Sequence, residues 1–289
     1  MTCDTFGPIR GPVTVIGAGT MGHGIAQVAA MAGFDTRLYD VDAEASAHAL
    51  ALVEANLDKG VELGKLEPAA RNAALENLSA PGEAAEAADR ADLVIEAVPE
   101  DLALKRRVLS GFAAYVSPDA IVASNTSSLS ISRIAEGVPG PERLVGLHFF
   151  NPVHIMSLVE VVRGDRTAER ALEQAQRFVE VLGKEPIVVN DSPGFASSRL
   201  GVALGLEAIR MLEAGVASAH DIDRAMELGY RHPMGPLRLT DLVGLDVRLN
   251  IARYLHSELG ERFRPPALLE RLVEEGKLGR KSGQGFYTW

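Results

Sequence analysis

VTVIGAGTMG, residues 13–22, is the stretch that decides the fold of this chain. Its first four residues are apolar or β-branched and predict a buried strand. The G-x-G-x-x-G pattern that follows predicts a turn into a helix, because Gly17 permits the tight turn and Gly22 permits close helix–strand packing. Gly19 leaves the backbone open to a phosphate group, and the helix N-terminus offers it free N–H groups and a partial positive charge.

The chain then returns through a second strand, Thr36–Tyr39, to Asp40, which lies 23 residues after Gly17. An acid at this spacing accepts hydrogen bonds from a ribose 2′-hydroxyl and repels a 2′-phosphate. These features together predict an NAD site and not an NADP site. The alternative is a packing glycine loop with a chance acid. The cofactor residues expected here are Gly17, Gly19, Thr20, Met21, Gly22 and Asp40.

Short β-branched runs alternate with helical segments as far as residue 190, at 13–16, 36–39, 93–95, 120–123, 144–147, 158–162 and 186–189. This alternation predicts a Rossmann-type α/β fold, a doubly wound and mostly parallel sheet. The stretch from about 44 to 77 exceeds one crossover helix, so it predicts a helical pair leaving the sheet. Pro68 stands where the second helix of that pair begins.

Strand patterns stop after Asn190, and the rest of the chain is expected to be all-helical. We therefore expect an NAD-binding domain over 1–190 and a helical substrate and dimerisation domain over 191–289. Helical segments are expected at about 219–228, 235–259 and 266–275. An earlier helix ends at Gly215, and its apolar face is predicted to contain Leu200, Leu204, Ile209 and Leu212.

Composition excludes several classes of protein. The 289 residues are 47% hydrophobic and 24% charged, and no apolar run of about 18 residues indicates a membrane span. A net charge of −10 speaks against a nucleic-acid partner. The first ten residues do not have the pattern of a signal peptide. The chain has one cysteine, Cys3, so no internal disulfide can form. We expect Cys3 to be an incidental surface thiol, which fits a reducing cytoplasm.

Polar residues follow the third and fourth long runs. Glu100 and Asp101 either begin the next helix or face a ligand at the sheet edge. Lys105, one turn later, either reaches the cofactor or is a solvated lysine. Thr126-Ser127-Ser128 is either a helix cap or a source of a hydroxyl that binds a substrate oxygen.

His148 and Glu160 are the candidates for proton transfer. If the strands at 144–148 and 157–163 pair antiparallel about residue 154, these two side chains lie opposite each other. A carboxylate beside an imidazole fixes its tautomer and stabilises the protonated ring, and an unperturbed histidine pKa of about 6.5 suits removal of an alcohol proton near neutral pH. A lone histidine at a strand end is otherwise structural.

Eight ordered segments resemble the L-3-hydroxyacyl-CoA dehydrogenase family, its bacterial 3-hydroxybutyryl-CoA branch above all. They are GAGTMGHGIA (17–26), VIEAVPED (94–101), SNTSSL (124–129), HFFNPV (148–153), PGF (193–195), HPMGPL (232–237), DLVGLD (241–246) and GRKSGQGFY (279–287). The resemblance spans nearly the whole chain past residue 11. It implies an acyl-CoA substrate, NAD, a role in fatty-acid β-oxidation and a homodimer formed through the helical domain.

The resemblance also implies roles for individual residues. His148 becomes the general acid/base and Glu160 its partner, while Ser127 binds the substrate oxygen. Glu100 and Lys105 lie near the nicotinamide ribose. Asn151 falls within the substrate-site motif, with its role open.

One position departs from the family pattern. The family's PGF motif continues with two residues and then Asn-Arg, whereas this chain has Ser198 before Arg199. The family's Asn helps to polarise the thioester carbonyl. Ser198 still donates a hydrogen bond, but with a shorter reach. Losing one such donor costs up to a few kcal/mol of transition-state stabilisation, at roughly the scale of a lost oxyanion contact.

Two other functions remain open at this stage. One is a dehydrogenase of a non-CoA hydroxy acid, of the gulonate or carnitine type. The other is an NAD(H)-binding protein with little catalysis, for which Ser198 is the only support. The sequence shows no spacing of histidine, cysteine and acidic residues typical of a metal site, so no metal is expected.

Overall fold

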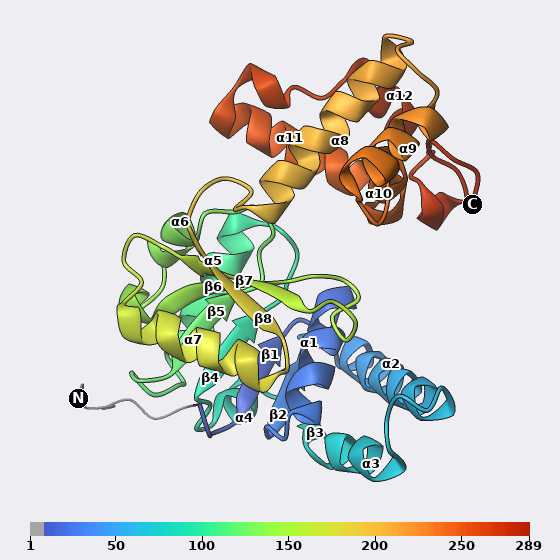
Figure 1. Cartoon of the computed structure of the whole chain (residues 1–289). Helices are drawn as coiled ribbons and strands as arrows, with labels where there is room; N and C mark the ends of the chain where they lie inside the picture. The colour runs from blue at the N-terminus through green and yellow to red at the C-terminus, as the bar shows by residue number, and fades with distance from the viewer. Residues whose placement is uncertain (1–8) are drawn as a thin grey trace, which may run out of the picture. The chain divides into compact units, whose positions relative to one another are not determined.

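A computed structural model describes residues 9–289, so Cys3 lies outside the described residues. The chain divides after Asp191 into two compact units, an α/β unit and the helical unit Ser192–Trp289 (Figure 1). Across the described part of the chain, no helix has both the length and the apolar character needed to span a bilayer.

The α/β unit is built on one eight-stranded sheet of order β3-β2-β1-β4-β5-β6-β7-β8. Every neighbouring pair is parallel except β6 and β7, which are antiparallel. This confirms the predicted fold class and all seven predicted strands. The strands are β1 (Val13–Ile16), β2 (Thr36–Tyr39), β3 (Leu78–Ser79), β4 (Leu93–Glu96), β5 (Ile121–Ser124), β6 (Leu144–Phe149), β7 (Leu158–Arg163) and β8 (Glu185–Asn190).

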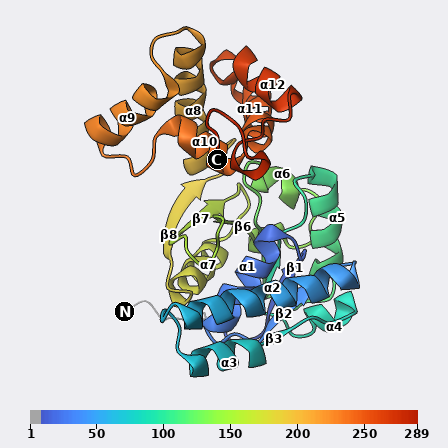
Figure 2. The same ribbon diagram turned by 90° about the vertical axis from the view of Figure 1, so that its right-hand side faces the viewer.

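Helices cover both faces of this sheet, as Figures 1 and 2 show. On one face, α1 (Thr20–Met31) and α7 (Glu169–Val181) pack on Val15, Ile95 and their neighbours. On the other, α4 (Ala84–Ala88) and α5 (Leu102–Ala113) enclose the alternate side chains of the same strands. The short helix α6 (Ile131–Ala135) and the 3₁₀ turn η1 (Pro141–Arg143) precede β6. Because both faces are covered, every residue of the central strands β1, β4 and β5 is buried, including the polar Thr14, Glu96 and Ser124.

The predicted helical pair is present as α2 (Ala43–Glu62) and α3 (Pro68–Glu76). The Asp42 side chain caps α2 by accepting from the N–H of Glu44, and Pro68 occupies the first turn of α3. The pair has a small core of its own, formed by Val53, Leu57 and Ala74. These helices therefore form an excursion from the sheet that packs beside α1 (Figure 2).

The helical unit contains α8 (Ser197–Glu213), α9 (Ala219–Tyr230), α10 (Pro236–Val243), α11 (Leu245–Leu259) and α12 (Ala267–Glu274), with short 3₁₀ turns η2 (Glu261–Phe263) and η3 (Arg280–Ser282). Gly215, in the left-handed conformation at φ +69°, follows the end of α8 as predicted. The core of this unit gathers apolar side chains from α8, α11 and α12.

Two expectations for this unit were wrong. The single helix expected over 235–259 is broken at Gly244, whose φ of +105° is a backbone conformation that α-helices do not contain. Leu200 is 71% exposed and does not lie on the buried face of α8. That face is formed instead by Val202, Leu206 and Ile209 together with the small residues between them.

Candidate active site

The glycine loop between β1 and α1 has the geometry of a phosphate-binding turn. Gly17 adopts φ +102°, and a Cβ there would fall 2.8 Å from the Ala97 carbonyl oxygen. A Cβ on Gly22 would fall 1.7 Å from the Gly17 carbonyl oxygen, so only glycine allows the helix to begin here. No atom lies within 4 Å of a Cβ built on Gly19. A side chain at Gly17 or Gly22 would therefore clash with the protein backbone, whereas the space beside Gly19 is open.

The first turn of α1 is ready to receive an anion. Gly19 is its N-cap, no side chain caps it, and no acid occupies its first turn. A cavity of about 690 Å³ lies beside it, lined by the glycine loop, the end of β2, Ala97–Pro99 and one face of α5. These features fit a dinucleotide, with its pyrophosphate on the helix terminus.

Asp40 lies at the carboxyl end of β2 and lines the same cavity. Its Oδ2 accepts from the Ala18 N–H at 2.8 Å, and its Oδ1 accepts from the Asp42 N–H at 3.1 Å. Two backbone donors thus hold the carboxylate in place where it lines the cavity. Arg37, by contrast, donates to the carbonyl oxygens of Glu86 and Asp89 and plays a structural part.

The end of β4 carries a charge cluster in which Glu96 and Lys105 are buried and Glu100 is exposed. Lys105 is 1% exposed, and its Nζ lies 2.8 Å from Glu96 Oε1 and 3.2 Å from Glu100 Oε2. The same Nζ donates to the Val98 carbonyl oxygen at 3.1 Å, while the Val98 N–H donates to Glu96 at 2.7 Å. Val98 lines the cofactor cavity, so this cluster fixes part of the cavity wall.

The two carboxyl groups of this cluster are perturbed in opposite directions. Burial raises the pKa of Glu96, although the nearby Lys105 charge acts the other way. Burial also acts to raise the pKa of Glu100, but Lys105 and hydrogen bonds from Thr126 and Ser127 outweigh it and hold that pKa below its usual value. Glu100 is therefore the carboxyl that stays ionised in this cluster.

Glu100 also organises the hydroxyl-rich segment after β5. Its Oε1 accepts from Thr126 Oγ1 at 2.6 Å and from the backbone N–H groups of Ser127 and Ser128, each at 3.1 Å. The Ser127 side chain is half-buried and makes no hydrogen bond to any residue in the 9–289 range. The expected helix cap was wrong, because the N-cap of α6 is Ser130, whereas Thr126 Oγ1 accepts from the Leu129 N–H at 2.9 Å within the loop before that helix. Asp101 is the N-cap of α5 and accepts from the Leu104 N–H.

The antiparallel pairing of β6 and β7 confirms the predicted opposition of His148 and Glu160. The two residues are register partners, and His148 Nδ1 lies 2.7 Å from Glu160 Oε2. They are 4% and 0% exposed. The contact places the Nδ1 proton on the side facing the carboxylate, so Nε2 carries the lone pair of the neutral ring.

Asn125 links the serine segment to this pair and was not predicted from the sequence. It is 7% exposed, and its Oδ1 accepts from the Phe149 N–H at 2.9 Å, which ties the end of β5 to the end of β6. Glu96 was missed as well, since a carboxylate at the end of an apolar run resembles a simple strand terminus. Neither residue leaves a periodic signal in the sequence.

The remaining predicted residues lie apart from these clusters. Asn151 is exposed in the loop after β6, where it precedes a cis-proline. Ser198 is half-buried in the first turn of α8, in the helical unit. The α/β unit thus brings together Glu100, Lys105 and Ser127 in one network, and His148 with Glu160 in another. No group of His, Cys, Asp and Glu residues placed to hold a metal ion occurs within residues 9–289.

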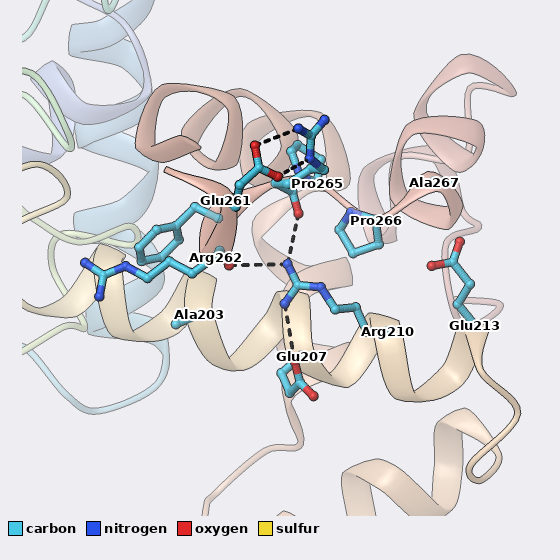
Figure 3. A pocket seen from close by; sticks show the side chains of 11 residues that line it. Ala203, Glu207, Arg210, Glu213, Glu261, Arg262, Pro265, Pro266 and Ala267 are labelled. Atoms are coloured by element: carbon cyan, nitrogen blue, oxygen red, sulfur yellow. Dashed lines mark hydrogen bonds and ion pairs between the residues drawn. The ribbon is translucent and has the colours of Figure 1, made fainter. Parts of the chain in front are cut away.

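A second cavity, of about 610 Å³, lies in the helical unit between α8 and the segment 261–267 (Figure 3). Most of its charged groups are paired, and the Arg262 guanidinium lies over the Phe263 ring at 5.2 Å. Arg210 contacts Glu207 at 3.3 Å and donates to the Arg264 carbonyl oxygen at 2.9 Å, while Glu261 binds the Arg264 side chain at 2.6 Å (Figure 3). These contacts tie α8 to the turn after α11.

Comparison with known proteins gives consistent matches. Residues 12–192 match the NAD-binding domain of 3-hydroxyacyl-CoA dehydrogenase, and residues 194–289 match the C-terminal domain of the same family. A probable 3-hydroxybutyryl-CoA dehydrogenase of Bacillus subtilis is 44% identical over 278 residues, which is 96% of each chain.

Solved structures give the same result. The crystal structure of FadB2 of Mycobacterium tuberculosis is 43% identical and superposes with a TM-score of 0.94, over 98% of this chain and all of that one. The (S)-3-hydroxybutyryl-CoA dehydrogenase PaaH1 of Ralstonia eutropha is 38% identical with a TM-score of 0.92, over 97% and 99% of the two chains.

Proposed function

The chain belongs to the 3-hydroxyacyl-CoA dehydrogenase family, and we propose that it interconverts L-3-hydroxyacyl-CoA and 3-oxoacyl-CoA with His148 as the general acid/base. It is an oxidoreductase that uses NAD. Short acyl chains such as 3-hydroxybutyryl are the proposed substrates, in both directions of the reaction. The observation that carries the proposal is the buried contact of His148 with Glu160, 2.7 Å long, at the carboxyl edge of the sheet.

The cofactor-binding residues have separable tasks in this proposal. The N–H groups of the first turn of α1 bind the pyrophosphate, and Asp40 accepts from the adenosine ribose. Glu100 and Lys105 form the wall at the nicotinamide end, because a dinucleotide crosses the strand ends from β2 towards β4 and β5. When bound, NAD⁺ supplies the acceptor for the hydride that leaves C3 of the substrate.

The chain's own side chains handle the proton. His148 Nε2 takes the proton of the C3 hydroxyl, and Glu160 holds the ring in the required tautomer and stabilises its protonated form. The Ser127 hydroxyl donates to the same substrate oxygen while charge develops on it. We assign Asn151 and Ser198 to substrate contacts, with Ser198 as the donor to the thioester carbonyl.

We propose that two chains associate through the helical unit. Exposed apolar side chains on α9, α10 and α11 support this, among them Tyr230 at 75%, Leu242 at 41% and Val247 at 39% exposure. Sedimentation equilibrium of the full chain tests it, since a monomer at micromolar concentration contradicts the dimer. A cytoplasmic location and a role in fatty-acid β-oxidation complete the proposal.

The test of function is the oxidation of NADH or NADPH by acetoacetyl-CoA, followed by nicotinamide absorbance. Rapid oxidation of NADH and slow oxidation of NADPH is the expected result. A second arm uses Asp40→Asn, which should raise the relative rate with NADPH because the carboxylate no longer repels a 2′-phosphate. Tight NADH binding without turnover would contradict the acyl-CoA substrate and favour a non-CoA hydroxy acid or a weakly catalytic protein.

A further inference from the structure

Asn125 lies between the two groups that must meet one substrate oxygen in the proposed reaction. It follows β5 directly, two residues before Ser127, and its side chain contacts Phe149, the residue after His148. Ser127 and His148 follow or end neighbouring strands, β5 and β6 (Figure 1). Their side chains can therefore serve the same oxygen only if the ends of these two strands are held at a fixed spacing.

The backbone pairing of β5 with β6 stops before this point. Its last register pair is Ser124 with Gly146, and the Asn125 N–H donates instead to the Glu96 carbonyl oxygen of β4, at 2.8 Å. Strand β6 continues for three more residues, to Phe149, and there it pairs with β7. The end of β6 that contains the histidine thus extends beyond the ladder that joins this strand to β5.

The Asn125 side chain takes over where that ladder stops. Its Oδ1 accepts from the Phe149 N–H at 2.9 Å, and the whole residue is 7% exposed. A buried backbone N–H rarely goes without an acceptor, so this bond is the one that the end of β6 requires on that side. It holds the strand end at a fixed distance from the segment that leads into Ser127.

Other contacts fix Ser127 and His148 separately. Glu100 accepts from the Ser127 N–H at 3.1 Å and so ties the serine segment to the wall of the cofactor cavity. Glu160 contacts His148 Nδ1 at 2.7 Å, and the Phe150 ring lies 4.4 Å from the imidazole, centre to centre. Each of these contacts orients one group against its own surroundings, and none of them joins the two groups to each other.

We propose that Asn125 is a positioning residue, which matches the Ser127 hydroxyl to His148 Nε2 so that both meet the same substrate oxygen. This role rests on the acyl-CoA dehydrogenase function proposed above. There, Nε2 exchanges the proton of that oxygen while Ser127 donates to it, and a misplacement of about 1 Å can cost about 100-fold in rate. Asn125 acts through its bond to Phe149 and contributes no reacting atom.

A purely structural role for Asn125 predicts different kinetics. If the residue only stabilised the fold, its loss would lower the unfolding free energy and leave kcat of the folded enzyme unchanged. The positioning role instead predicts a lower kcat with nearly the same KM for NADH, because the contacts of Glu100 with the serine segment remain.

The experiment is a double-mutant cycle on the oxidation of NADH by acetoacetyl-CoA. Values of kcat and KM are measured for the wild type, Asn125→Leu, Ser127→Ala and the double variant, because leucine is close to asparagine in size and removes the acceptor. Asn77→Leu is the matched control. Asn77 is a half-buried asparagine of the same unit, at the end of α3, and its side chain donates to the Ala30 carbonyl oxygen at 3.2 Å.

Asn125→Leu should lower kcat by about 10- to 100-fold, at the scale of a small misplacement of a catalytic group. On the Ser127→Ala background the same substitution should cost at least about threefold less, because no hydroxyl remains to be matched to His148. Independent sites would instead add to within about twofold. Asn77→Leu should leave kcat unchanged.

Three outcomes would overturn the role: an unchanged kcat in Asn125→Leu, an equal loss on both backgrounds, or a rise in the KM for NADH that accounts for the whole loss. If Asn125→Leu does not fold, the cycle is run with Asn125→Ala, whose vacated space a water can occupy, and the same outcomes apply. A wild type that binds NADH but does not reduce acetoacetyl-CoA contradicts the proposed function and this role with it. An active wild type with an additive cycle contradicts the role of Asn125 alone.

Discussion

The carboxyl edge of the sheet and the junction of α8 with α11 both bury charge, but they treat it differently. At the sheet edge, Lys105 lies between Glu96 and Glu100, and His148 faces Glu160. Each charged group there has a partner within 3.2 Å. At the helix junction, Arg248 has none.

This difference separates charges that the fold compensates internally from a charge that it does not. A buried group whose partners are all internal is fixed in place, and removing one partner leaves another uncompensated. A buried charge without a partner raises the free energy of the folded state, because its lost hydration is not replaced. Substitutions at the two places should therefore act on stability with opposite signs.

The largest effect is expected from breaking the His148–Glu160 pair in a way that preserves its shape. His148→Gln should lower turnover by about 10²- to 10⁴-fold, the usual contribution of a general acid/base. The affinity for NADH, measured by fluorescence titration, should change little, because His148 is not among the cofactor residues. Near-normal turnover in this variant would remove His148 from the mechanism.

The next effect concerns the stability of the sheet edge. Lys105→Met should lower the unfolding free energy by about 3–5 kcal/mol, because Glu96 and Glu100 lose their shared cation. Urea denaturation measures it. Lys59→Met is the control, since Lys59 forms an exposed pair with Glu62 and should cost less than about 1 kcal/mol. Equal losses of unfolding free energy in the two variants would show that Lys105 contributes no more to stability than an exposed ion pair does.

Arg248→Met should act in the opposite direction. In the absence of substrate, replacing a buried uncompensated cation by an apolar side chain of similar length should raise the unfolding free energy by about 1–3 kcal/mol. The same denaturation experiment serves as the measurement. A loss of stability as large as that of Lys105→Met would mean that Arg248 has an internal role, and the contrast between the two regions would fail.

The smallest effect is a pH dependence at Glu96. Burial raises the pKa of Glu96 above the ordinary 4.5, so between these two values the folded chain holds a proton that the unfolded chain has lost. Its contribution therefore weakens the fold as pH rises through that window. The unfolding free energy of the wild type relative to Glu96→Gln should fall as pH rises through this window, and the contribution of Glu100 cancels because both proteins contain it. A relative stability that rises instead would contradict the assignment.

Much of the fold was predictable because its signals are local. Apolar runs, the glycine loop and Pro68 mark strands, a turn and a helix start through short-range sterics. The strand β3 was not predicted because it contains two residues only, Leu78 and Ser79. The break at Gly244 was missed because the flanking residues keep a helical pattern on both sides of it.

Individual residues of the site were predictable from the sequence, but their burial and the contacts that connect them were not. His148 and Glu160 were found because strand register brings them together once the pairing is antiparallel. The burial of Lys105 was not predictable, since a lysine in an amphipathic helix is usually solvated. The burial of Arg248 was equally unpredictable, because only the folded structure shows that it is enclosed and that no acid lies beside it.

The antiparallel pairing of β6 and β7 separates the spacing of the His148–Glu160 pair from the shape of the loop that joins the two strands. The distance from His148 to Glu160 is set by strand register, whereas the segment 150–157 is fixed at Phe150, which packs on His148, and at the buried Val153. A doubling of such a loop's length costs about 0.6 kcal/mol in closure entropy. This loop contains Asn151 and the exposed Ile155, so insertions there would reshape the surface above the pair and leave its spacing intact. Substrate range and proton chemistry can therefore evolve, or be engineered, on separate parts of one hairpin.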